Sequence, residues 1–246
     1  MTNLSKMLSI LNLVDRQAPY VMPEIIAVRL GVSRATGYRY VKQLCDAGIL
    51  IRTKTGLYAL SPRICELGSL ARDRDPLIVA GGRWMRELAE KIAIPVVCSV
   101  LYDRHVINTW ITETGGHMPF SYGIGHPLPL FLGAQSKLLV AFQKGQHLYS
   151  LFDSIRNDSK HPYRDTSWSE FAQEAKRIRK TGYCFTHNEL NPGMAGIAAP
   201  VLMAPASHAR ASISVVGSKE RFDLLGKELL ARELLAVSQK ITAAIG

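Results

Sequence analysis

The chain has few cysteines and lacks the long apolar runs of membrane and secreted proteins. Its four cysteines lie far apart and form no CxxC pair, which predicts free or buried thiols instead of a zinc site or a disulfide framework. No segment approaches the roughly 18 consecutive apolar residues of a membrane span. The N-terminus also lacks the basic flank and apolar run of a secretory signal. We therefore expect a cytoplasmic protein without a membrane partner.

Motifs for catalysis and cofactor binding are equally scarce. The seven histidines include no i, i+4 pair, so they predict no metal site on a helix. Gly123-Ile-Gly125 lacks the third glycine of a dinucleotide-binding fingerprint. No glycine follows Ser136 at the position that a hydrolase nucleophile elbow requires. We expect no metal, no cofactor and no catalytic residue, and hence a protein that is not an enzyme.

Positive charge is concentrated toward the start of the chain. The 246 residues carry a formal net charge of +10, which favours polyanionic partners. Residues 1–75 hold 11 Lys and Arg against 6 Asp and Glu, a net charge of +5, and the remaining 171 residues also total +5. The density of net positive charge is therefore more than twofold higher in the first segment, which favours a nucleic-acid site there.

Residues 23–60 show the pattern of two short helices followed by a hairpin. Pro23 suits a first helical residue, Gly31 suits the left-handed residue that ends a helix, and Ser33 suits the N-cap of the next helix. That helix carries an apolar stripe at i, i+3, i+4, i+7 spacing: Gly37, Tyr40, Val41 and Leu44. Residues 49–52 and 57–60 predict two strands joined by a tight turn. The pattern predicts a winged helix-turn-helix.

The helix face opposite the apolar stripe is basic and predicts contact with double-stranded DNA. The alternative is that this face is simply exposed to solvent. Arg34 and Thr36 lie in the first turn, where a helix approaches base edges, and Tyr38 and Lys42 suit phosphates. Arg39 has two interpretations, a DNA contact or a salt bridge that braces the domain. The residues that we expect to bind DNA, wing included, are Ser33, Arg34, Thr36, Tyr38, Arg39, Lys42, Arg52 and Lys54.

The rest of the chain predicts an α+β domain with an antiparallel sheet flanked by helices. We expect a hairpin over 95–112, helices over 133–142 and 167–182, strands over 196–203 and 209–216, and one last helix over 223–244. The predicted domains are a winged helix-turn-helix over 1–62, a linker helix over 63–75 and an α+β domain over 76–246.

A set of short motifs, in this order along the chain, resembles the IclR family of bacterial transcriptional regulators. The motifs are Ser33-Arg-Ala-Thr36, Ala47-Gly-Ile-Leu50, Pro129-Leu-Phe-Leu-Gly-Ala134 with Lys137, Glu189 followed by Gly193, Ile197-Ala-Ala-Pro-Val201 and Ala211-Ser-Ile-Ser-Val215. The resemblance implies a GAF-like domain that binds a small organic acid or aromatic metabolite as effector. It also implies a dimer or tetramer on palindromic operator DNA.

The resemblance places the effector between the start of the 133–142 helix and the strand that carries Ser212 and Ser214. Unpaired backbone N–H groups at that helix start would suit an anion. The two serines are two residues apart and share one face, which is either the pocket or solvent. Glu189 is a pocket residue in one interpretation and a structural carboxylate in the other. The expected effector residues are Met118, Tyr122, Leu130, Gly133, Ala134, Glu189, Gly196, Ser212 and Ser214.

Two other functions stay open at this point. The chain could be a small-molecule enzyme that carries a DNA-binding-like domain, although its sequence shows no nucleophile–base pair or metal cluster. It could also be a DNA-binding protein that responds to no effector. Motifs alone also leave open whether such a regulator represses or activates transcription.

Overall fold

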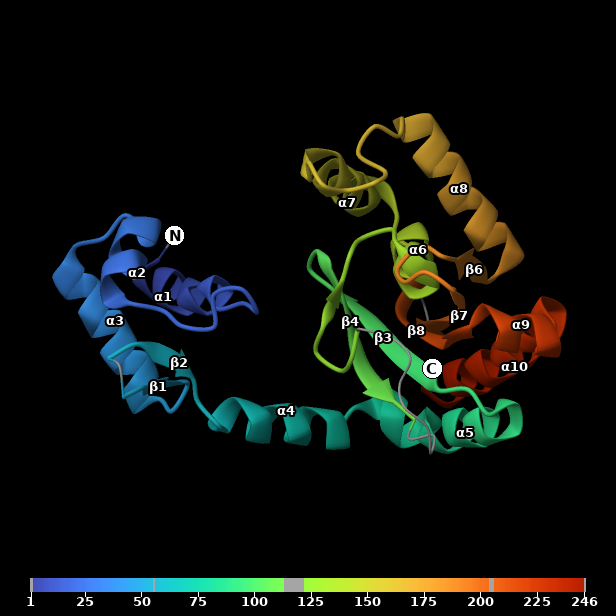
Figure 1. Ribbon diagram of the computed structural model, residues 1–246, viewed down its shortest axis with the longest axis horizontal. Helices are drawn as coiled ribbons and strands as arrows, with labels where there is room; N and C mark the ends of the chain where they lie inside the picture. The colour runs from blue at the N-terminus through green and yellow to red at the C-terminus, as the bar shows by residue number, and fades with distance from the viewer. Residues whose placement is uncertain (1, 55, 113–121, 204–205, 246) are drawn as a thin grey trace. The chain divides into compact units, whose positions relative to one another are not determined.

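A computed structural model describes residues 2–54, 56–112, 122–203 and 206–245. The chain forms two compact units, Met1–Asp73 and Arg74–Gly246, each with its own hydrophobic core. Figure 1 shows the first unit from blue to teal and the second from green to red. Within the described ranges, no helix is both long enough and apolar enough to cross a membrane.

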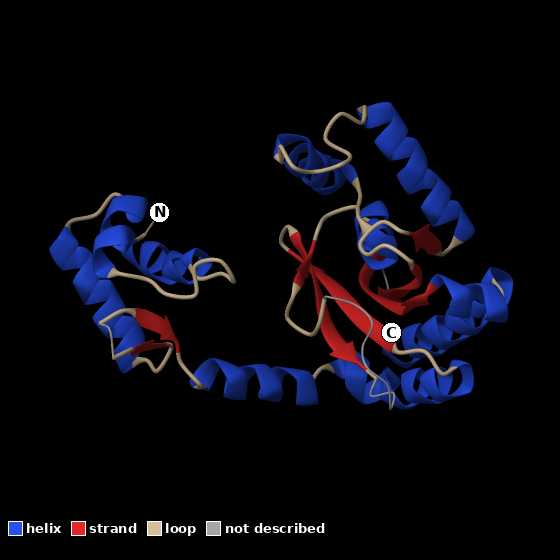
Figure 2. Ribbon diagram, in the orientation of Figure 1, coloured by secondary structure: helices blue, strands red, loops and turns tan. Residues whose placement is uncertain are grey.

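The first unit is a three-helix bundle with a two-stranded hairpin and a following helix (Figure 2). Its elements are α1 (Asn3–Leu8), a 3₁₀ turn (Ser9–Leu13), α2 (Pro23–Leu30), α3 (Arg34–Asp46), β1 (Leu50–Arg52), β2 (Tyr58–Leu60) and α4 (Arg63–Asp73). The strands are antiparallel, with Leu50 opposite Leu60 and Arg52 opposite Tyr58. This order confirms the predicted winged helix-turn-helix.

Local signals define the turn between α2 and α3. Gly31 adopts a φ of 61°, and its N–H bonds back to carbonyls in the last turn of α2. Ser33 then caps α3, because its side chain accepts a hydrogen bond of 3.2 Å from the N–H of Thr36. The predicted stripe is buried: Gly37, Tyr40, Val41 and Leu44. Three of these residues form a core with Ile10, Ile26 and Leu50.

Gly37 is the point of closest approach between α2 and α3. A Cβ at this position would lie 2.6 Å from the carbonyl oxygen of Pro23, a distance that real Cβ atoms essentially never show. The missing side chain therefore lets the two helices of the motif pack closely, and this close packing sets the position of α3 against α2.

The second unit is built on one curled, antiparallel sheet of order β5-β4-β3-β8-β7-β6. The strands are β3 (Val96–Tyr102), β4 (His105–Ile111), β5 (Pro127–Leu128), β6 (Cys184–His187), β7 (Met194–Met203) and β8 (Ala206–Ser218). The longest strands, β7 and β8, pair with each other, and β8 lies beside β3 at the centre of the sheet. This arrangement confirms the predicted α+β class with a GAF-like domain.

Helices cover both faces of this sheet (Figure 1). The helices of this unit are α5 (Pro76–Ile92), α6 (Gly133–Ala141), α7 (Gly145–Asn157), α8 (Trp168–Thr181), α9 (Lys219–Leu225) and α10 (Lys227–Ile245). A core that includes Met85 of α5, Ile241 of α10 and Ile213 of β8 fills one face. On the other face α6 packs against β7, β8 and α8, and all nine of its residues are buried.

One predicted element differs from the structure. The last helix, expected over 223–244, is two helices, because Gly226 adopts a φ of 81° and a ψ of 134° and separates α9 from α10. The apolar residues on both sides of Gly226 keep a helical period, so their spacing alone does not reveal the break between the two helices.

We expect Gly37→Ala to destabilise the first unit by about 1–3 kcal/mol, because the added methyl group must push α3 away from the Pro23 carbonyl. Urea unfolding of the full chain, followed by a signal from the first unit, measures this loss. The control is Gly68→Ala in α4, where a Cβ would meet Arg72 at an ordinary 3.6 Å. That change should stabilise by about 0.5–1 kcal/mol. Equal effects of the two variants would contradict the argument.

Candidate nucleic-acid interface and ligand cavity

The outer face of α3 carries the basic residues that the sequence singled out. Arg34, Tyr38, Arg39 and Lys42 are exposed, and Thr36 is half-buried beside the capping Ser33. The opposite side of the helix packs into the core, so these side chains have no role in closing the first unit. The arrangement leaves a polar, mainly basic helix surface open to a partner.

One acidic residue joins this surface, and sequence reasoning missed it. The Oε1 atom of Glu24, in the first turn of α2, accepts hydrogen bonds from Nη2 of Arg34 at 2.6 Å and from the hydroxyl of Tyr38 at 2.7 Å. The Tyr38 hydroxyl, a backbone N–H and Arg34 together lower the pKa of Glu24. The only sequence signal was an acidic residue directly after Pro23.

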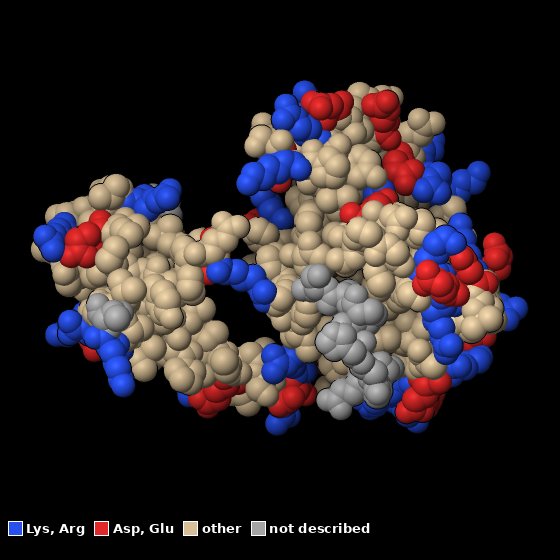
Figure 3. Space-filling model, in the orientation of Figure 1, with Lys and Arg blue, Asp and Glu red and all other residues tan. Residues whose placement is uncertain are grey.

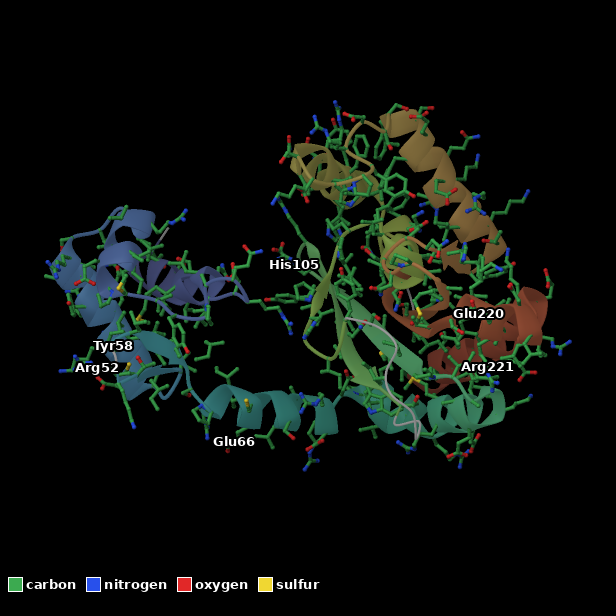
Figure 4. The ribbon with its side chains drawn as sticks, viewed as in Figure 1. Arg52, Tyr58, Glu66, His105, Glu220 and Arg221 are labelled. Carbon is green, nitrogen blue, oxygen red and sulfur yellow. The ribbon has the colours of Figure 1, made fainter. Side chains whose placement is uncertain are left out.

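The remaining predicted DNA contacts are also on the surface. Arg39 lies with its guanidinium carbon 5.9 Å from the ring centre of Tyr40. Among the described residues it has no carboxylate within salt-bridge distance, so the bracing interpretation has no support. Arg52 and Lys54 of the hairpin are exposed, and Figure 4 shows Arg52 beside Tyr58 on the paired strands. In Figure 3 the first unit shows separate groups of Lys and Arg over a largely uncharged surface.

The second unit contains a small cavity of about 30 Å³ between the start of α6 and the sheet. It is lined by Asn108, Tyr122, Leu128, Gly133, Ala134, Gln135, Thr186, Glu189, Leu190, Asn191, Met194, Ala195, Gly196 and Val216. Five of the expected effector residues are therefore brought together: Tyr122, Gly133, Ala134, Glu189 and Gly196. Leu130 instead lines a separate groove with His161, and Met118 lies outside the described residues.

The Glu189 side chain binds polar groups in the first turns of α6. Its Oε2 atom accepts the N–H of Gly133 at 3.0 Å, and its Oε1 atom lies 2.5 Å from Nζ of Lys137. The Lys137 and Glu189 side chains are only 8% and 20% exposed. The expectation that the N–H groups at this helix start are unpaired is therefore wrong for Gly133, because a side-chain carboxylate already satisfies it.

Lys137 remains charged in this site. Burial alone would lower the pKa of Lys137, but its hydrogen bonds to Glu189 and to Tyr163, 2.9 Å away, outweigh that effect and raise the pKa. The ammonium also lies over the Tyr163 ring, 4.7 Å from its centre. The result is a buried, paired cation behind the cavity wall.

Ser212 and Ser214 are completely buried, so the solvent-facing interpretation is wrong. They occupy the face of β8 opposite the buried set Ala211, Ile213 and Val215. Ser214 donates weakly to the Val97 carbonyl at 3.4 Å, and the Ser212 hydroxyl has no hydrogen-bond partner within the described part of the chain.

Beside Ser212, on β3, Ser99 hydrogen bonds to Asn108 at 2.8 Å, and Asn108 donates to the Tyr122 carbonyl. This polar chain runs from the cavity, which Asn108 and Tyr122 both line, to Ser99, and among the described residues the Ser212 hydroxyl opposite Ser99 makes no hydrogen bond to it.

Several lining residues were not found from the sequence. Val216 follows Ser212 and Ser214 on the same face of β8, so continuing the alternation by two residues would have identified it. Thr186 and Leu190 come from β6 and the loop after it. The φ of 76° at Gly133 favours glycine, and a Cβ there would also lie 2.4 Å from the Leu190 side chain, which would have to shift.

The described ranges give little support for metal binding or for a reactive cysteine. They contain no group of three His, Cys, Asp or Glu residues that could hold a metal ion. Burial raises the pKa of both Cys98 and Cys184 to about 12, so these thiols stay protonated and unreactive near neutral pH.

The fold combines a winged helix-turn-helix with a GAF-like second domain. A family model described as the bacterial transcriptional regulator IclR C-terminal domain matches residues 71–243. Because the match covers well over half of the chain, this chain belongs to the IclR family of bacterial transcriptional regulators.

Known relatives resemble the chain over nearly its full length. The uncharacterized HTH-type transcriptional regulator RhmR of Escherichia coli K12 is 23% identical over 243 residues, covering 99% of this chain and 93% of that protein. A crystal structure of a putative IclR transcriptional regulator from a Silicibacter species has a TM-score of 0.82 at 19% identity, covering 100% and 96% of the two chains. An IclR homologue from Microbacterium hydrocarbonoxydans, solved in complex with 4-hydroxybenzoate, has a TM-score of 0.73 at 17% identity, with 99% of each chain covered.

We expect Lys137→Met to destabilise the second unit by about 3 kcal/mol, because it leaves the largely buried Glu189 carboxylate without its cation. Chemical denaturation of the full chain measures the loss. The matched control is Lys91→Met, since Lys91 is 61% exposed and pairs with Glu233 at 2.7 Å. That variant should lose less than about 1 kcal/mol. A smaller loss for Lys137→Met than for Lys91→Met would contradict the structural role.

The same pair gives a pH signature. Because the pKa of Lys137 is raised above its ordinary 10.5, its contribution is complete below that pH and is lost as the pH rises through the folded-state value. The stability difference between wild type and Lys137→Met should therefore stay constant near neutral pH and shrink in strongly alkaline buffer.

Proposed function

We propose that this protein is a ligand-responsive transcriptional regulator that binds palindromic operator DNA as a dimer or tetramer. The observation that carries the proposal is the outer face of α3, where Arg34, Tyr38 and Lys42 are exposed on a helix whose other side is fixed in the core. An α-helix of this kind fits the major groove of B-DNA, which is about 12 Å wide.

The residues of this face suit different parts of a duplex. Arg34 and Thr36 lie in the first turn of α3, where Arg suits guanine O6 and N7 and Thr suits a phosphate or a thymine methyl group. Lys42, Arg52 and Lys54 are exposed cations that suit phosphates and add affinity without base preference. In a symmetric dimer the two α3 helices would lie about 34 Å apart along the DNA, or a multiple of this spacing.

A small organic acid or aromatic metabolite is the proposed effector. The cavity of about 30 Å³ is smaller than the roughly 300–1,000 Å³ of most small-molecule sites, so the lining side chains would have to move apart to admit the effector. Leu190, Met194 and Val216 offer apolar walls, and Gln135 and Thr186 offer polar groups. The 4-hydroxybenzoate complex of a protein with the same fold supports an aromatic acid as the first compound to test.

Effector and operator must then influence each other equally. If an effector changes the affinity for DNA by a given factor, DNA changes the affinity for the effector by the same factor. The linker helix α4, in which no residue is buried, lies between the two candidate sites along the chain and is the proposed path of coupling.

DNA binding is tested by fluorescence anisotropy of a labelled 30-base-pair duplex over a series of salt concentrations. We expect wild type to bind, and Lys42→Ala to lower the slope of log affinity against log salt by about 1 for each subunit bound. Lys176→Ala is the control, because Lys176 is an equally exposed cation on α8 of the second unit. Failure of wild type to bind any duplex at low salt would overturn the proposed function.

Effector binding is tested by thermal shift against aliphatic and aromatic carboxylates, with 4-hydroxybenzoate included. A ligand at 100 times its dissociation constant should add about 2.7 kcal/mol of stability. Gly196→Ala should fold normally, because its Cβ would contact Ala134 at 3.5 Å, but it narrows the cavity and should reduce the shift. Gly68→Ala in the first unit should leave the shift unchanged. No shift with any acid, or equal shifts in all three proteins, would contradict the cavity as the effector site.

A further inference from the structure

We propose that Glu24 is a positioning residue that sets the base specificity of α3. It holds Arg34 ready for one base and opposes binding to DNA that lacks that base. This inference rests on the proposed function, because it requires α3 to enter a DNA groove. It concerns an acidic residue on a surface otherwise selected for positive charge.

The geometry makes Glu24 the centre of a three-residue cluster across the helix-turn-helix. A single oxygen, Oε1, accepts from both Arg34 at 2.6 Å and Tyr38 at 2.7 Å. Arg34 and Tyr38 lie one turn apart on α3, whereas Glu24 comes from α2. The guanidinium carbon of Arg34 also lies 5.9 Å from the centre of the Tyr38 ring. The two side chains are thus tied to a point on the neighbouring helix.

Stability of the fold does not explain this cluster. The side chains of Arg34 and Glu24 are 70% and 40% exposed, and exposed ion pairs contribute little to folding. An acidic side chain here also lowers the positive potential that would attract phosphates. The arrangement costs general DNA affinity, which points to a gain elsewhere.

The gain in base specificity comes from holding Arg34 in place before DNA binds. A guanidinium has five N–H donors in a rigid plane, and the bond from Nη2 to Glu24 leaves donors for a bidentate contact with guanine. Because Arg34 is already held, it loses less rotamer freedom when it meets that base.

On DNA with another base, Arg34 must break from Glu24 to reach a phosphate, and the carboxylate then faces the DNA unpaired. Specificity therefore includes a repulsive component as well as an attractive one.

The test compares Glu24→Gln with wild type on two probes: a random-sequence 30-base-pair duplex, and a duplex selected from a random library by wild type. The variant should bind the random duplex more tightly, with a salt slope steeper by about 1 per subunit, because Arg34 becomes free for a phosphate. The ratio of selected to random affinity should fall about tenfold, the scale of one bidentate base contact. Repeating the selection with the variant should weaken the guanine preference that Arg34→Ala also removes.

Two further variants separate positioning from charge and from folding. Glu66→Gln removes the same charge from an exposed pair with Arg63 in the same unit, and it should leave the base preference unchanged (Figure 4). Tyr38→Phe removes one of the two bonds to Glu24 and should shift the ratio in the same direction as Glu24→Gln, by less. Thermal melting confirms that each variant is folded.

The outcomes are distinct. If Arg34→Ala loses a base preference while Glu24→Gln and Tyr38→Phe keep the wild-type ratio, Glu24 is only a surface ion pair and this inference is wrong, although the proposed function stands. If Glu66→Gln changes the ratio as much as Glu24→Gln does, net charge explains the effect and the inference is again wrong. If wild type binds neither duplex, the proposed function fails and the inference fails with it.

Discussion

The arrangement of the second unit depends on the buried carboxylate of Glu189. All nine residues of α6 are buried, so the polar groups at its start cannot turn to water and must be satisfied by the protein. Glu189 bonds to the Gly133 N–H and pairs with Lys137 one turn further along the helix. The loop after β6 is thereby fixed against α6, and it places the Leu190 side chain against Gly133. The cavity lies where these segments meet β7 and β8.

In the first unit, close backbone contact between two helices sets the position of α3, whereas in the second unit a pair of charged side chains holds α6. Gly37 lets α3 approach the first turn of α2, and this approach brings Glu24 within reach of Arg34 and Tyr38. One backbone contact therefore sets both the angle of the motif and the position of an arginine on its outer face. A core residue and a surface residue are linked through the same pair of helices.

Sequence reasoning succeeded where the signal is local. Gly31 and Ser33 mark the turn between α2 and α3, and the Ser167 capping box marks the start of α8, because each acts within three or four residues. It failed where partners are distant in sequence: Lys137 and Glu189 are 52 residues apart, and Glu24 is 10 residues from Arg34. It also missed α7, whose N-cap residue makes no capping hydrogen bond through its side chain. The spacing of residues predicts which side of a helix or strand a side chain occupies. It does not predict which residues from distant parts of the chain contact that side chain.

The two carboxylates differ in what their surroundings allow. Glu24 is exposed to water, where an ion pair contributes little to folding, so its bond to Arg34 adds little to the stability of the first unit. Glu189 is largely buried, and separating it from Lys137 would cost several times more. If the proposed effector is an acid, it would therefore not displace Glu189 from Lys137.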